Sequence, residues 1–109
     1  MAFRCRYNDR QTIDIVTAAC TRITGYTIEE VLQSRFGLLD ITDPRDEESV
    51  YNDVRQSLLQ FRPLETRYRI LTKTGASVWV TEHSGPSIGP DGRIVFTGFI
   101  EMLRPGLER

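Results

Sequence analysis

The sequence of 109 residues predicts a single α+β domain spanning residues 1–109, with an antiparallel sheet formed by segments from both ends of the chain. Apolar and polar residues alternate near the N-terminus and again after residue 63, which is the two-residue period of strands. Between these regions, apolar residues recur at helical spacing. Repeats and low-complexity linkers are absent from the sequence. The predicted order is therefore β-β-α-α-α-β-β-β.

The first two strands are predicted from short alternating segments. Phe3, Cys5 and Tyr7 alternate with charged or polar residues, as in a half-buried strand. After a polar turn, Ile13 and Ile15 flank an aspartate and predict the second strand.

Two short helices follow. Thr17 is suited to cap the first, and Gly25 can end it in a left-handed conformation. Thr27 and Glu30 have the spacing of a capping box, in which each side chain accepts a backbone N–H that would otherwise be unpaired. The sequence therefore predicts a helix over residues 28–33.

A longer helix begins at residues 43–46, because proline suits the first turn and carboxylates favour its positive end. It carries an apolar stripe predicted to face the sheet: Val50, Val54, Leu58 and Phe61. Arg62-Pro63 ends it.

The rest of the chain predicts three strands, over residues 64–72, 78–84 and 94–102. A Lys-Thr-Gly turn separates the first two, and Pro90-Asp91-Gly92 is a strong turn signal before the third. The third strand is apolar on both faces, which predicts a central position in the sheet.

Composition excludes several functional classes. The chain has 14 basic and 15 acidic residues and a formal net charge of −1, which gives no electrostatic case for binding nucleic acid or an anionic membrane. Its apolar runs are too short to span a bilayer or to form a signal peptide. Cys5 and Cys20 lie far apart without a Cys-x-x-Cys motif, so we expect free thiols and a cytoplasmic location.

Several segments resemble the PAS family, in one order and at compatible spacing over nearly the whole chain. They are residues 23–32, similar to the Leu-Thr-Gly-Tyr-Ser-x-Glu-Glu-Leu segment of that family, residues 43–46, residues 65–69, residues 74–75, residues 78–80, Gly92, Arg93 and Gly98. Three features depart from the family pattern: Thr17 replaces a common Asn, residues 8–11 lack the usual Gly, and residues 100–102 replace an Asp-Ile-Thr ending.

The resemblance implies a five-stranded antiparallel sheet of order 2-1-5-4-3, with short helices packed on one face. It also implies sensing or protein–protein interaction in a signalling pathway, with the output in another domain or protein. A catalytic role is not expected.

The resemblance includes a flavin-binding photoreceptor subclass, and the sequence argues against membership of it. That subclass has a reactive Cys just after the second helix, whereas residues 34–40 contain none. It also places amide side chains against the flavin, at positions that correspond here to Ile70, Val80 and Ile100. These apolar side chains cannot satisfy the polar edge of the ring. We therefore expect no flavin.

His83 is the only histidine, and it could be a haem ligand or a pH switch. In haem-binding relatives the ligand comes from the long helix, which has no histidine here. His83 is in phase with Trp79 on the outer face of the sheet, so we expect a structural or solvent-facing role and no haem.

The inward-facing residues of the sheet and long helix could line a small apolar ligand pocket or form a solid core, and for so small a domain a solid core is the simpler expectation. The pocket candidates are Val54, Leu58, Tyr68, Ile70, Val78, Val80, Phe96 and Ile100.

The outward-facing apolar residues predict a homodimer, since a two-fold axis lets one patch cover its own copy. The dimer-face candidates are Leu71, Trp79, Val95 and Phe99. Trp79 is expected to be the central anchor.

Three functional classes stay open: a ligand-sensing module, a ligand-free interaction module and a small α+β enzyme. The enzyme would need a carboxylate inside the pocket. Glu82 is the one carboxylate in phase with the inward residues Val78 and Val80, and the pattern places it near the end of its strand. Glu29, Glu30 and residues 46–48 are explained by the positive ends of helices.

Overall fold

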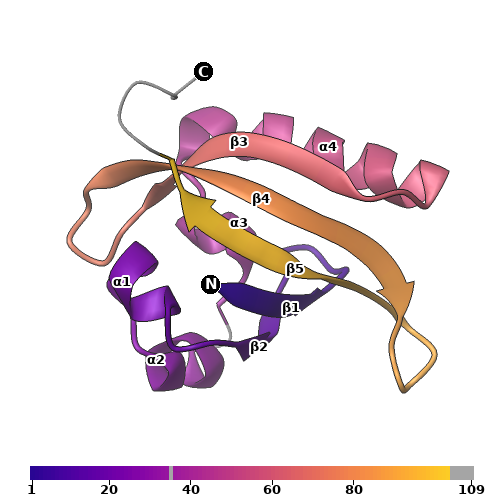
Figure 1. Ribbon diagram of the computed structural model, residues 1–109, viewed down its shortest axis with the longest axis horizontal. Coiled ribbons are helices and arrows are strands. Elements are labelled where there is room, and N and C mark those ends of the chain that lie inside the picture. The colour runs from indigo at the N-terminus through magenta and orange to yellow at the C-terminus, as the bar shows by residue number, and fades with distance from the viewer. Residues whose placement is uncertain (35, 104–109) are drawn as a thin grey trace.

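The computed structural model describes residues 1–34 and 36–103, and its centre is a five-stranded antiparallel sheet (Figure 1). The strands are β1 (Ala2–Arg6), β2 (Ile13–Val16), β3 (Leu64–Leu71), β4 (Ser77–Ile88) and β5 (Ile94–Met102). They lie in the order β2-β1-β5-β4-β3. This confirms the predicted α+β class and sheet order, with β5 in the centre.

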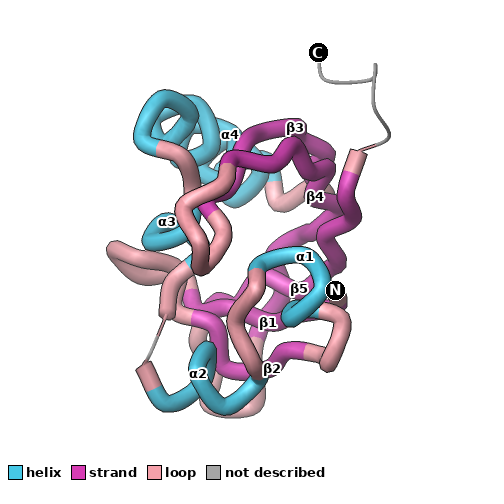
Figure 2. The backbone as a smooth tube through the Cα atoms, turned by 90° about the vertical axis from the view of Figure 1, so that its left-hand side faces the viewer, coloured by secondary structure: helices cyan, strands magenta, loops and turns pink. Residues whose placement is uncertain are grey.

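Five helical segments connect β2 to β3. They are α1 (Cys20–Thr24), α2 (Ile28–Gln33), α3 (Leu38–Ile41), the 3-10 turn η1 (Pro44–Asp46) and α4 (Glu47–Gln60). Figure 2 shows α2, α3 and α4 on one side of the curved sheet, which we call the inner face. No helix within the described residues is both long and apolar enough to cross a membrane.

The predicted capping box of α2 and the predicted glycine cap of α1 are confirmed. Thr27 Oγ1 accepts the Glu30 N–H at 3.1 Å, and Glu30 Oε1 accepts the Thr27 N–H at 2.9 Å. Gly25 ends α1 with a φ of 82°, a left-handed conformation that glycine adopts without strain. At the start of η1, the Asp43 side chain accepts the Arg45 N–H at 2.9 Å.

Thr17 does not cap α1, and that prediction was wrong. The helix begins at Cys20, and Ala19 in front of it supplies no side-chain hydrogen bond. Thr17 Oγ1 instead accepts the backbone N–H of Ala2 at 3.0 Å, so it ties the end of β2 to the start of β1.

Ile13 and Ile15 do not share a face, because β2 contains a bulge. Cys5 pairs with Ile13 and Arg4 pairs with Ile15, so Asp14 is an extra residue on β2. The bulge turns Ile15 outward, where it is 50% exposed, and returns Val16 to the core.

Phe61 does not belong to the buried stripe of α4. It occupies the left-handed cap after the helix, with a φ of 50°, and its side chain is 54% exposed. Val50 and Val54 are buried and Leu58 is partly buried, so the stripe covers the first three of the four predicted positions.

The structure adds two features to the prediction. Residues 38–41 form the short helix α3, and β4 continues to Ile88 instead of ending at Ser84. The extension passes through Pro86, which pairs with Phe96 of β5. Since β3 begins at Leu64, opposite Ser84, it does not extend to Pro86, and the proline interrupts no ladder with β3.

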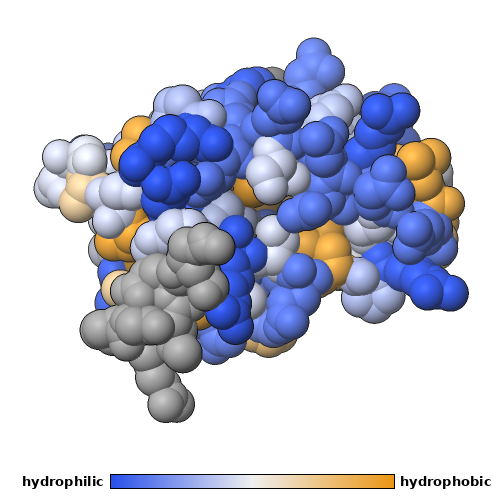
Figure 3. Space-filling model, turned by 90° about the horizontal axis from the view of Figure 1, so that it is seen from above, coloured by the Kyte–Doolittle hydropathy of each residue, from blue (hydrophilic) through white to orange (hydrophobic). Residues whose placement is uncertain are grey.

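The core lies between the inner face of the sheet and the helices. Its buried members are Phe3, Cys5, Ile13, Val16, Cys20, Ile23, Val31, Leu38, Leu39, Ile41, Val50, Val54, Tyr68, Ile70, Val80, Phe96 and Ile100. The surface on the side of α4 and β3 is mostly hydrophilic, with separate apolar spots (Figure 3).

Candidate functional site

A polar cluster lies inside the apolar core, on the inner face of β3 and β4. The Glu82 carboxylate accepts a hydrogen bond from Tyr68 Oη at 2.7 Å and another from Ser84 Oγ at 2.6 Å. Glu82 is 2% exposed and Tyr68 is 1% exposed. We call Tyr68, Glu82 and Ser84 the interior cluster.

The register of the sheet creates this cluster. Glu82 pairs with Thr66 on β3 and with Ile100 on β5, and Tyr68 pairs with Val80 one step along the same face. Alternate residues of a strand point to the same side, so Val80, Glu82 and Ser84 all project inward. Because β4 runs to Ile88, Glu82 lies in the middle of the strand and not near its end, as the sequence pattern had suggested.

Burial controls the electrostatics of the interior cluster. It raises the pKa of Glu82 above the usual 4.5, while the hydrogen bonds from Ser84 and Tyr68 act in the opposite direction. Burial also raises the pKa of Tyr68 well above its usual range, and the nearby Glu82 charge adds to that effect. Burial therefore favours the protonated form of Glu82 more than exposure to water would.

A second hydrogen bond links the helical layer to the sheet beside this cluster. Thr66 Oγ1 donates to Asp53 Oδ2 of α4 at 2.7 Å. Thr66 is the β3 partner of Glu82, and the Asp53 charge contributes to the raised pKa of Glu82. This hydrogen bond thus links α4 to β3, which together with β4 carries the interior cluster.

The eight predicted pocket residues include Tyr68 of the interior cluster, and all of them lie in the hydrophobic core or pack against it. Val54, Tyr68, Ile70, Val80, Phe96 and Ile100 are buried in the core, and Leu58 and Val78 are partly buried against it. Three of them, Ile70, Val80 and Ile100, are the positions weighed above for a flavin, and they present apolar side chains to the interior.

A small enclosed apolar space lies elsewhere in the interior. It measures about 10 Å³, the size of about one water. It is lined by Met1, Ile13, Val16, Cys20, Thr24, Tyr26, Val31, Phe36 and Ile41. None of these was among the predicted pocket residues.

The four predicted dimer-face residues lie on the outer face of the sheet but differ in exposure. Phe99 is 46% exposed, and Leu71 and Trp79 are half-buried. The Trp79 ring lies under the Arg69 guanidinium at 4.9 Å. Val95 is only 7% exposed, so it does not extend an exposed apolar patch. It lies beside Gly89 in the β4–β5 hairpin.

His83 lies on the outer face between carboxylates from the two neighbouring strands. Its Nδ1 is 3.4 Å from Glu65 Oε2, and its Nε2 is 3.4 Å from Glu101 Oε1. Its ring stacks on Phe99, with centroids 4.7 Å apart. The sequence located His83 on this face, but the two carboxylates could be found only once the strands were aligned.

Arg69 joins the outer face to the start of α4. Its backbone N–H, Nε and Nη2 all donate to the Asp46 carboxylate, at 2.8, 2.8 and 2.6 Å. These hydrogen bonds hold the pKa of Asp46 below its usual value. The two residues are 23 positions apart, so no local sequence pattern indicates this contact.

Comparisons with known proteins agree on one fold. A family model described as PAS fold matches residues 13–100. The N-terminal domain of a diguanylate cyclase with PAS/PAC sensor from Marinobacter aquaeolei gives a TM-score of 0.71 at 16% identity, over 93% of this chain and 92% of that chain. No curated protein matches the sequence.

Light-oxygen-voltage proteins are also similar in structure. A solved light-oxygen-voltage domain gives a TM-score of 0.74 at 15% identity, over 95% of this chain and 76% of that chain. An RNA-binding light-oxygen-voltage receptor gives 0.69 at 20% identity, over 93% of this chain and 29% of that chain. At such identities these likenesses show the fold alone.

Proposed function

Because the chain belongs to the PAS family, the sensor domains of signalling proteins, we propose that it acts as an interaction module that pairs with a second copy of itself. The outer face of its sheet is the proposed contact surface. The observation that carries the proposal is a contrast between the two faces of the sheet. The inner face is packed in the core, whereas the outer face has an aromatic centre, formed by Phe99, His83 and Trp79, that is at least partly exposed.

The filled interior supports an interaction module over a ligand receptor. The predicted pocket residues all belong to the hydrophobic core or pack against it, and each oxygen of Glu82 already accepts a hydrogen bond from Tyr68 or Ser84. A ligand would have to break these bonds before it could form its own, and each buried group left unpaired costs about 1–3 kcal/mol.

The outer face supports a symmetric contact. Phe99 and His83 form a stacked pair on adjacent strands, and Trp79 lies farther along the same face. Glu65 and Glu101 flank His83. A two-fold axis through this face would bring the aromatic residues of the two copies together, and aromatic anchors dominate such contacts.

We also propose that the domain is not an enzyme, that it acts in the cytoplasm and that it passes its signal to another domain or protein. Both cysteines are buried, and the interior carboxylate is engaged by its neighbours, which supports a structural role for these groups.

Sedimentation equilibrium tests the self-association. We expect the wild type to dimerise at micromolar concentration, and Trp79→Ala and Phe99→Ser each to weaken the dimer by about tenfold or more. Leu59→Ser is the matched control, since Leu59 is 68% exposed but lies on α4. A wild type that stays monomeric, or a dimer equally affected by the control, would contradict the proposal.

A second candidate function, sensing of a small molecule, is favoured by the interior cluster itself. A buried carboxyl with a raised pKa is a common feature of binding sites. Native mass spectrometry of the purified protein distinguishes the two functions. A bound mass that disappears in Glu82→Gln would support ligand sensing, and a dimer whose mass equals two chains without added ligand would support the interaction module.

A further inference from the structure

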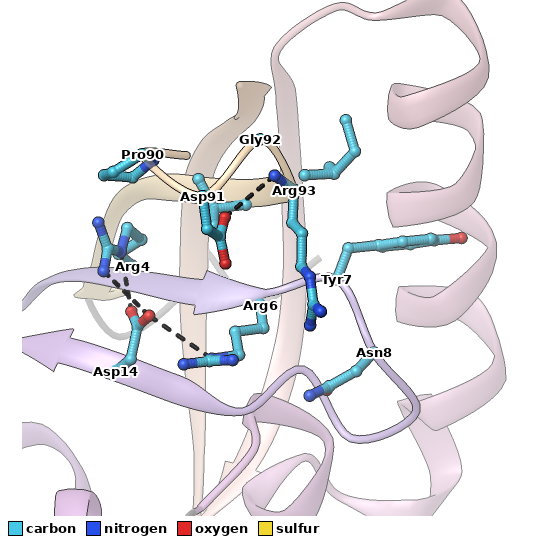
Figure 4. Close-up of a pocket in the computed structure, with 11 residues that line it drawn as sticks. Arg4, Arg6, Tyr7, Asn8, Asp14, Pro90, Asp91, Gly92 and Arg93 are labelled. Carbon is cyan, nitrogen blue, oxygen red and sulfur yellow. Dashed lines mark hydrogen bonds and ion pairs between the residues drawn. The ribbon is translucent and has the colours of Figure 1, made fainter. Parts of the chain in front are cut away.

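A surface cleft lies where the β1–β2 turn and the β4–β5 turn approach each other (Figure 4). Its volume is about 600 Å³, within the ~300–1,000 Å³ range of small-molecule sites. Arg4 and Arg6 project into it from the outer face of β1, because they pair with Thr97 and Val95 of β5. The cleft is therefore on the opposite side of the sheet from the interior cluster.

One of its arginines is fully occupied. Arg4 Nε and Nη2 donate to the two oxygens of Asp14 at 2.9 and 3.0 Å, a two-pronged ion pair. This pair neutralises Asp14 and fixes the back wall of the cleft. Asp14 reaches this position because the bulge in β2 makes it the extra residue of the strand.

Two other arginines supply charge to the cleft. Arg6 is 55% exposed and its Nε lies 3.8 Å from Asp14 Oδ2, a distance too long for a hydrogen bond. Arg93 is exposed, and Figure 4 shows its side chain extending toward Tyr7. Among the described residues, the Arg93 guanidinium has no carboxylate within salt-bridge distance. The nearby Asp91 Oδ1 accepts a hydrogen bond from the Arg93 backbone N–H at 3.0 Å.

The cleft is cationic although the chain is not. Three arginines and two aspartates line it, so its formal charge is 3 − 2 = +1, whereas the whole chain has −1. The planar fork of a guanidinium matches the geometry of carboxylate and phosphate oxygens. The charge therefore selects an anionic ligand.

Apolar surface accompanies the charge. The cleft is also lined by Tyr7, Pro90, Ile94 and Val95, of which Val95 is only 7% exposed. Tyr7 is 39% exposed, and its ring lies 6.1 Å, centroid to centroid, from that of the core residue Phe96, so the exposed Pro90 and the partly exposed Ile94 supply the apolar surface. A ligand that fits both features has a charged oxygen group joined to an apolar body.

We propose that this cleft binds a small organic anion, with its carboxylate or phosphate held by Arg6 and Arg93 and its apolar body against Pro90 and Ile94. The site is separate from the interior cluster and from the aromatic centre of the outer face. It would give the domain an input for a soluble metabolite-sized anion, beyond the proposed self-association.

Titrations of the ¹⁵N-labelled domain with three naphthalene compounds test the site by NMR. The compounds are 2-naphthoate, 2-naphthyl phosphate and the uncharged 2-naphthamide. We expect the backbone amide signals of Arg6, Tyr7 and Gly92 to shift with at least one anion, and naphthamide to bind about tenfold more weakly or not at all. Whichever anion binds more tightly identifies the oxygen group.

Variants locate the binding. Arg6→Gln and Arg93→Gln should each weaken the better anion by about tenfold, with unchanged melting temperature because both side chains are exposed. Arg22→Gln, at an exposed position on α1, should bind like the wild type. The proposal is wrong if neither anion shifts the cleft amides up to about 10 mM, if naphthamide binds equally well, or if the Arg6 and Arg93 variants bind like Arg22→Gln.

Discussion

The two faces of the sheet satisfy their polar groups in different ways. On the inner face, Glu82 is bonded to Tyr68 and Ser84 and is sealed from water. On the outer face, His83 lies between Glu65 and Glu101 at 3.4 Å from each, with Phe99 exposed beside it. The hydrogen-bond partners of Glu82 on the inner face are thus fixed by packing. On the outer face, water or another protein can replace the carboxylates that flank His83. Changes on the inner face should affect folding, and those on the outer face should affect association.

Gly98→Val should produce the largest effect, and it tests how tightly the central strand is enclosed. An added Cβ at Gly98 would lie 2.0 Å from the His83 carbonyl oxygen and 2.5 Å from Ser84 Cα. The collision is therefore with the backbone of β4, and not with the helices. We expect the free energy of unfolding to fall by about 3 kcal/mol or more, measured by urea denaturation.

The matched control for this strand is Thr97→Val. Thr97 is exposed on the outer face of β5, so its substitution should change stability by no more than about 0.5 kcal/mol. Equal effects of the two substitutions would show that the faces do not differ as described.

Glu82→Leu should be the next largest effect. It leaves the hydroxyls of Tyr68 and Ser84 without their buried acceptor, and we expect a loss of about 2–3 kcal/mol. Adding Tyr68→Phe should recover part of that loss, since one unpaired donor is removed. A double variant as unstable as the sum of the singles would contradict the proposed bond between the two side chains.

The interior cluster also predicts a pH dependence of stability. Because the pKa of Glu82 is raised in the folded state, the folded protein binds this proton more tightly than the unfolded chain. The free energy of unfolding should therefore fall as the pH rises from 4.5 toward the folded pKa. Glu82→Gln should remove this slope, and an unchanged slope in denaturation series between pH 4 and 8 would assign it to other groups.

Asp46→Asn should have a smaller effect with the opposite pH dependence. The pKa of Asp46 is lowered by its bonds to Arg69, so its contribution is complete above 3.8 and is lost as the pH falls through the folded value. We expect a loss of about 1 kcal/mol near neutral pH and little difference from wild type in strong acid. Asp9→Asn, at an exposed turn position, is the control.

The sequence was sufficient to predict the sheet order and most elements because local signals and the family resemblance agreed. The capping box of Thr27 and Glu30 and the two apolar faces of β5 each depend on neighbouring residues alone. The errors arose where a contact between distant segments decided the outcome. Thr17 bonds to Ala2 across two strands, and Ile15 is turned outward by a bulge.

The candidate site was harder to predict for the same reason. The alternating pattern placed Glu82 on the inner face, but the strand was predicted to end at Ser84, and so Glu82 was expected near its end; the strand in fact continues to Ile88. Tyr68 and Ser84 become its partners only through the β3–β4 register. The Asp46–Arg69 contact depends on how the chain passes from α4 to β3. No local sequence pattern indicates that path, because the two residues are 23 positions apart.

The central claim, that the outer face is the contact surface, is tested most directly by ¹⁹F NMR of the protein labelled with 6-fluorotryptophan. The chain has a single Trp, so the one resonance reports Trp79 alone. We expect its shift difference between H₂O and D₂O to shrink as the protein is concentrated through the micromolar range, because a second copy excludes water from the ring. A solvent shift that stays the same at every concentration would contradict the account.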